Sequence, residues 1–139
     1  MAQIALSDLT ERYGQNTYQW ADVNGIWDNT TATLTGAVLA ALMVNINASI
    51  NSADARIDDL LRGTSLNFIF PVVDLTGAVP LTIKDCKRKL AGYMLSTARD
   101  VRDFDANGKP ITNLYSDYVD AMQIVEDIRS KKIILNCQY

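Results

Sequence analysis

The feature that most constrains this chain of 139 residues is a long segment without any charge. Between Thr35 and Ala53 the sequence contains no Asp, Glu, Lys or Arg. Apolar residues recur there and beyond at steps of three and four, which predicts a helix with one apolar stripe, ended by Gly63. The stripe comprises Val38, Leu39, Leu42, Met43, Ile46, Ile50, Ala53, Ile57, Leu60 and Leu61. A surface helix normally carries charges opposite its stripe, so we expect this one to be covered on more than one side.

Two arrangements would cover such a helix. In the first, the other helices of the same chain surround it, and in the second, a neighbouring subunit covers its outer face. A single domain of this length has little material with which to wrap one helix completely. We therefore expect a contact between subunits along this helix.

The remaining sequence predicts a mostly α fold. We expect a small bundle of about four helices with one long central helix, an extended arm or hairpin, and a strand-like C-terminal tail. Ser7 has the chemistry of an N-cap, which predicts a short helix over 8–13. Apolar spacing predicts further helices over 83–99 and 112–131.

Between the first two helices we expect a long loop, over 15–33, because no period is sustained there. This loop contains Trp20 and Trp27. Long loops in compact domains are often functional, and tryptophan is a frequent anchor at protein interfaces. The alternative is that both tryptophans fill the core of the bundle.

Two segments of extended, apolar sequence lie outside the predicted helices. The first is the arm around Phe68–Val73, where Pro71 favours an edge strand or an isolated extended segment. The second is the C-terminus, which is unusual because chain ends are normally polar. It either docks on another protein or pairs within its own domain. We assign 1–132 to one helical domain that contains the arm and its loop (64–80), and 133–139 to a docking tail.

The composition argues against catalysis and against a metal or cofactor. The chain has no histidine, which removes the usual general base and the commonest metal ligand. Its two cysteines, Cys86 and Cys137, are too few for a disulfide scaffold or a zinc site. Asp103–Gly108 resembles the start of a calcium loop, but Leu114 occupies the position of the bidentate Glu.

Charge and targeting signals place further limits on function. The net charge of −3 argues against a broad grip on nucleic-acid phosphates. We interpret Lys87-Arg88-Lys89 as a solvated helix face; the alternatives are an ion pair with another subunit or a partner protein, and a contact with nucleic-acid phosphates. The N-terminus lacks the basic region of a signal peptide, and the most apolar run, Ala37–Val44, is short for a membrane span. We expect a soluble protein, cytosolic when synthesised, with no membrane partner.

Several short motifs follow one another in a characteristic order. They are Arg12-Tyr13-Gly14, Ile57-Asp58-Asp59-Leu60-Leu61-Arg62-Gly63, Phe68-Ile69-Phe70-Pro71, Val79-Pro80, Lys89-Leu90-Ala91 with Tyr93, and Tyr115 and Tyr118 around Asp117. Together they span nearly the whole chain. Their order and spacing resemble the head-tail adaptor (head-completion, connector) proteins of tailed phages, of the Mu-like small connector type. The neutral, Asn-rich long helix and the apolar last segment depart from the family's pattern.

The resemblance implies a structural protein of the virion neck, assembled in the host cytoplasm. Its partners would be copies of itself in a ring, typically of twelve subunits, the portal protein, a tail or further neck protein, and genomic DNA that passes through the bore without specific binding. The alternatives are a tail-completion or stopper protein of the same particle, and a small helical regulator that binds DNA or protein. No catalytic residue is expected.

Under this interpretation three groups of residues receive roles. The tail would bind the portal through Ile133, Ile134, Leu135, Asn136, Cys137, Gln138 and Tyr139. Neighbouring subunits would be contacted by Trp20, Trp27, Phe68, Ile69, Phe70 and Val72. An acidic or neutral bore would not hold DNA, and Asp54, Asp58 and Asp59 are the candidates to line it.

Overall fold

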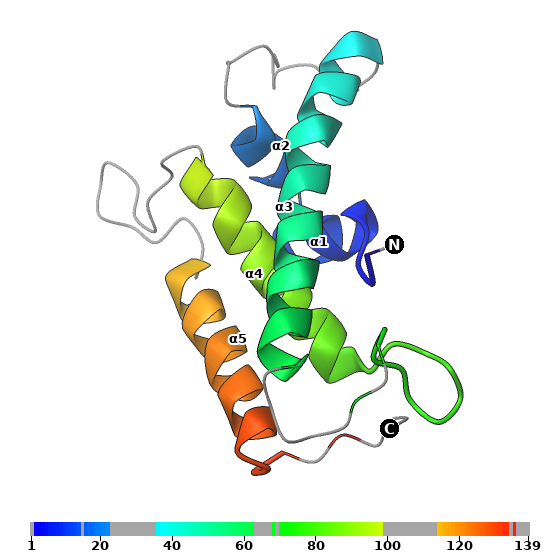
Figure 1. The fold of residues 1–139 in the computed structure, drawn as a ribbon. Coiled ribbons are helices and arrows are strands. Elements are labelled where there is room, and N and C mark those ends of the chain that lie inside the picture. Colours follow the sequence, from blue (N-terminus) through cyan, green and yellow to red (C-terminus); the bar gives the residue numbers. More distant parts are fainter. Residues whose placement is uncertain are drawn as a thin grey trace.

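The computed structural model describes residues 2–14, 16–22, 36–62, 68, 70–98, 114–133 and 135. This part of the chain forms a mostly α bundle with one long central helix and contains no strand, which confirms the predicted fold class (Figure 1). The helices are α1 (Leu6–Tyr13), α2 (Asn16–Ala21), α3 (Gly36–Arg62), α4 (Leu81–Ala98) and α5 (Leu114–Arg129).

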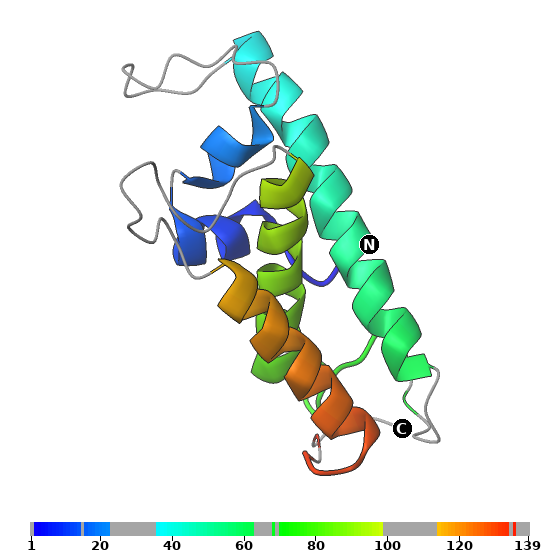
Figure 2. The same ribbon diagram turned by 90° about the vertical axis from the view of Figure 1, so that its left-hand side faces the viewer.

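Helix α4 is the centre of the arrangement. It packs against α3 on one side and against α5 on another, whereas α3 and α5 contact each other much less (Figures 1 and 2). The short helices α1 and α2 also pack against α4. The N-terminal turns of α3 extend beyond the end of α4, so much of this long helix has neighbours on one side only (Figure 2).

The core lies between α3, α4 and α5 and follows the predicted apolar spacing. The stripe of α3 is confirmed at its buried positions, which are Leu42, Ile46, Ile50, Ala53, Ile57 and Leu61. Facing them are buried residues of α4 and α5, which are Ile83, Cys86, Leu90, Ala91, Leu95, Ala121, Val125 and Ile128. Burial of this apolar surface is the main stabilising contribution to the fold.

The N-terminal region differs from the sequence prediction in two ways. Ser7 is not the N-cap, because α1 begins at Leu6 and the carboxylate of Asp8 accepts a hydrogen bond of 2.8 Å from the backbone N–H of Ala5. The predicted loop over 15–33 is wrong in its first part, where α2 forms. The six residues of α2 are mostly polar and too few to show a helical period, so the sequence pattern did not reveal this helix. Residues 23–35 lie outside the described part of the chain.

The segment between α3 and α4 contains a turn. The backbone N–H of Asp74 donates to the carbonyl of Ala78 at 2.7 Å, and Gly77 takes a φ of 89° that favours glycine. The carboxylate of Asp74 accepts hydrogen bonds from Thr76 and from the N–H of Ala78, which lower its pKa. The turn presents Leu75, which is 65% exposed.

A close contact between α1 and α4 constrains Gly92. A Cβ atom at this position would overlap Cε2 of the Tyr13 ring, and Tyr13 is itself buried. Glycine is therefore required here for packing, although it is a poor helix former.

We expect Gly92→Ala to destabilise the protein by about 1–3 kcal/mol, because overpacking outweighs the gain in helix propensity. Urea denaturation of the variant and the wild type would measure the difference. Ser52→Ala, at an exposed position of α3, is the control and should change stability little. Equal or greater stability of Gly92→Ala would contradict the packing shown here.

Candidate protein interface

A buried lysine joins α3 and α4. Lys87 is fully buried, and its Nζ lies 2.7 Å from Oδ1 of Asp54 and 2.9 Å from Oδ1 of Asp58. The two carboxylates are one helical turn apart, so they converge on the same ammonium group. The hydrogen-bond direction is met for Asp54 but not for Asp58, so the second contact is an ion pair without a directed hydrogen bond.

Gln3 extends this network to the N-terminal segment. Its side-chain carbonyl accepts a hydrogen bond from Lys87, and its backbone N–H donates to Asp54 at 3.0 Å. Its amide nitrogen donates to the carbonyl of Val72 at 2.7 Å. One lysine therefore fixes the positions of α3, α4, the first residues and the segment before the turn.

This network corrects two sequence predictions. Lys87 does not belong to a solvated face, because it is buried among carboxylates. Asp54 and Asp58 contact Lys87, so they are not free to line a bore, while Asp59 is exposed and pairs with Arg62. The signal that could have identified Lys87 is its register, four residues after Ile83 and three before Leu90, which places it on the apolar face.

A second buried charge joins the first and last helices. Asp117 of α5 accepts two hydrogen bonds from Arg12, of 3.0 and 2.6 Å, and a third, of 2.8 Å, from the hydroxyl of Tyr13. Burial and the hydrogen bond to Asp117 raise the pKa of Tyr13 above its ordinary value near 10. The hydrogen bond to Asp117 likewise raises the pKa of Arg12, so the guanidinium group stays charged.

Most of the predicted interface residues that the structure describes belong to the core of the chain itself. Trp20 is only 3% exposed and packs edge-on against Tyr13, as the alternative interpretation had it. Phe68 and Val72 are buried as well. Phe70 is half-buried beneath Arg62, whose guanidinium carbon lies 4.4 Å from the ring centroid. These side chains offer little surface to a neighbour, and Trp27 and Ile69 lie outside the described residues.

The start of the predicted tail packs on its own domain. Leu135 is 7% exposed, and Ile133 is partly buried against the same core. These two residues therefore follow the alternative in which the segment contacts its own domain. Residues 134 and 136–139 of the proposed portal-binding tail lie outside the described part.

The outer side of α3 is exposed and carries no charge until Arg56. We call this surface the α3 face; its exposed residues are Ala37, Ala40, Ala41, Val44, Asn47, Ala48, Asn51, Ser52 and Ala55. Val44 is 69% exposed although it lies in the middle of a helix. The helices that the structure describes therefore do not surround α3.

A second apolar surface lies on α5. The rings of Tyr93, Tyr115 and Tyr118 contact one another, with Tyr93 stacked on Tyr118 at a centroid distance of 4.4 Å. Tyr115 is 56% exposed, and Val119, one turn further along, is 43% exposed. We call Tyr115 and Val119 the α5 ridge.

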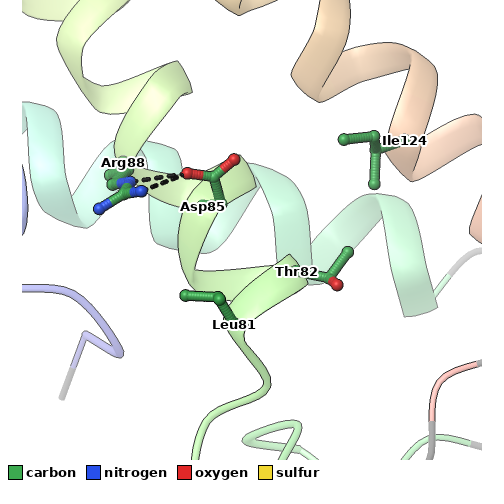
Figure 3. Close-up of a pocket in the computed structure, with 5 residues that line it drawn as sticks. All are labelled: Leu81, Thr82, Asp85, Arg88 and Ile124. Atoms are coloured by element: carbon green, nitrogen blue, oxygen red, sulfur yellow. Dashed lines mark hydrogen bonds and ion pairs between the residues drawn. The ribbon is translucent and has the colours of Figure 1, made fainter. Parts of the chain in front are cut away.

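The open pocket shown in Figure 3 lies between the start of α4 and the middle of α5, and is lined by Leu81, Thr82, Asp85, Arg88 and Ile124. Nε of Arg88 donates to Oδ1 of Asp85 at 2.7 Å, and its Nη2 forms an ion pair with the same oxygen at 2.6 Å, so the charge of Arg88 is already compensated. Partial burial opposes ionisation of Asp85, but the hydrogen bonds from Lys89 and Arg88 outweigh it and lower the pKa of Asp85. Such a pair does not offer an unbalanced charge to a ligand.

The described residues contain no group of three His, Cys, Asp or Glu that could hold a metal ion. The calcium-like segment Asp103–Gly108 lies outside them. Burial raises the pKa of Cys86 to about 12, so its thiol stays protonated and unreactive near neutral pH.

Within the described residues one helix, α3, has the length and apolar composition that a membrane span requires, a test that core helices of soluble proteins also pass. Comparison with protein-family models, with curated proteins and with solved structures found no match. The candidate interface is identified from the structure: it comprises the α3 face and the α5 ridge, because both are exposed and uncharged.

We expect Lys87→Met to lower the free energy of unfolding by about 3–5 kcal/mol, because it leaves two buried carboxylates without a counter-charge. Adding Asp54→Asn and Asp58→Asn to the same chain should recover part of this loss. Urea denaturation measures both effects, with Lys132→Met at an exposed position as the control. A loss no larger than that of the control would show that the network contributes nothing.

Stability should fall as the pH rises above about 10, the ordinary pKa of tyrosine. The raised pKa of Tyr13 means that the folded state keeps a proton that the unfolded state loses. The contribution of protonated Tyr13 to the free energy of unfolding is complete below that pH, and it is lost as the pH rises toward the pKa of Tyr13 in the folded state. Urea denaturation between pH 9 and pH 11 should therefore give a steeper decline for the wild type than for Tyr13→Phe; equal slopes would refute this assignment.

Proposed function

We propose that this protein is a structural head-tail connector subunit of a tailed-phage neck. In this role it forms a ring between the portal and the tail, assembles in the host cytoplasm, and lets genomic DNA pass through the bore without binding it specifically. The observation that carries the proposal is the α3 face, an exposed and uncharged surface in the middle of the longest helix. Exposed patches of this kind mark contacts with other proteins.

The distribution of basic residues agrees with a structural role. Lys84, Lys87, Arg88 and Lys89 all pair with carboxylates of the same chain. Such pairs do not form the unbalanced basic surface with which a DNA-binding regulator neutralises phosphates. We therefore favour a subunit that tolerates DNA nearby over one that binds it.

The proposal changes in detail from the sequence prediction. The described aromatic residues of the arm and of α2 stabilise the fold, so the contacts between subunits are assigned to the α3 face. Of the three acidic residues considered for the bore, Asp59 is the one with an exposed side chain. Ile134 and residues 136–139 remain the proposed portal contact.

The mass of the purified protein, measured alone and with the portal protein of the same genome, tests this function. We expect a closed ring of the protein on the portal. Val44→Asp should abolish the ring, because it places a charge in the α3 face, while circular dichroism stays unchanged. Leu75→Asp is the matched control, since Leu75 is exposed to a similar extent, 65% against 69%. If the mass of the portal protein is unchanged after mixing with the wild-type protein, the proposal is overturned.

A further inference from the structure

We propose that the α3 face of one copy receives the α5 ridge of the next copy. The inference rests on the proposed ring, and it names the two surfaces that meet. Because they are different surfaces of the same chain, the contact is heterologous and repeats around a ring. Each copy then uses both surfaces, one toward each neighbour.

The spacing of the α3 face is typical of a helix that packs lengthwise against another helix. Six exposed positions follow one another at alternating steps of four and three, and they are Ala37, Ala41, Val44, Ala48, Asn51 and Ala55. This is the repeat with which helices keep one seam toward a partner. The alanines allow the two helix axes to approach to about 8 Å, near the lower limit for packed helices.

The shape of the α5 ridge complements this surface. Tyr115 and Val119 are four residues apart, so their side chains form one row along the helix. The row is large and apolar where the α3 face is small and apolar. Asp120 is exposed beside the ridge, and Asn47 and Asn51 of the α3 face offer amide N–H donors to a carboxylate.

The two surfaces cannot meet within one copy, so a contact between them requires a second copy. Each lies on the side of its helix that faces away from the core, and α4 stands between the two helices (Figures 1 and 2). Neither surface carries Lys or Arg, so nucleic acid and acidic lipid are poor partners. The opposite side of α3 holds the buried residues Leu42, Ile46 and Ile57, so the helix is committed to its bundle.

The size of the contact explains why it would need a ring. The α3 face from Ala37 to Ala55 is about 28 Å long. A strip of that length and the width of one helix covers on the order of 300 Å² per copy, below the roughly 800 Å² per partner of a stable pair. A single contact is therefore weak, and closure of the ring or attachment to a platform adds the remaining stability.

Disulfide trapping between single-cysteine variants tests the proposal. Val44→Cys and Val119→Cys are each made in a Cys137→Ser background, where the remaining Cys86 is buried and protonated. The two proteins are mixed at high concentration under mild oxidation, and their far-UV circular dichroism is compared with that of the wild type. The cross-linked heterodimer should form about tenfold faster than in a mixture of Leu75→Cys with Val119→Cys, because the proposed contact holds the two thiols close together.

Two results would overturn the proposal. If Val44→Cys alone forms a homodimer faster than the mixture forms a heterodimer, the α3 face packs on itself in a two-fold dimer. If no mixture exceeds the Leu75→Cys control, the two surfaces do not meet.

The same experiment separates this inference from the proposed function. If the heterodimer forms but the protein does not bind the portal protein, the contact is supported and the proposed neck function is refuted. If the protein forms a ring on the portal protein but the cross-linked heterodimer does not form, the proposed neck function is supported and the contact is refuted.

Discussion

The architecture depends on the ammonium group of Lys87, enclosed between two carboxylates of α3. A buried charge is stable only when it is paired and hydrogen-bonded, so this lysine fixes the rotation of α3 about its own axis. Once the buried residues Leu42, Ile46 and Ile57 face the core, the exposed alanines and Val44 on the other side of the helix face outward. The candidate interface is therefore a geometric result of the buried stripe on the opposite side of the same helix, whose orientation the ion pairs on its flank help to fix.

The chain inverts the usual distribution of charge along α3. Its carboxylates at Asp54 and Asp58 are largely enclosed, and its outer surface is neutral from Gly36 to Ala55. A solvated helix normally has the opposite pattern, with charges outside and an uncharged interior. This inversion is costly for an isolated molecule and is explained if the outer surface is covered in the assembled state.

The sequence was informative where periodicity was strong. The stripe of α3 and the helices α4 and α5 could be predicted to within about two residues, because long periodic segments depend on local spacing. Sequence reasoning missed α2, whose six residues bury Trp20 through contacts with other helices. It also misplaced Lys87, because nothing local reveals that two aspartates 29 and 33 residues earlier would reach it. The α3 face was predicted, whereas the α5 ridge depends on which tyrosines the fold leaves exposed.

The ion pair between Arg12 and Asp117 has a consequence for folding during translation. Its two halves are 105 residues apart, and the contact of Gln3 with Lys87 spans 84 residues. During translation, α1 therefore cannot form its contact with α5 until α5 has been synthesised. Folding is postponed to the end of translation, which also delays the moment at which the α3 face can meet a second molecule.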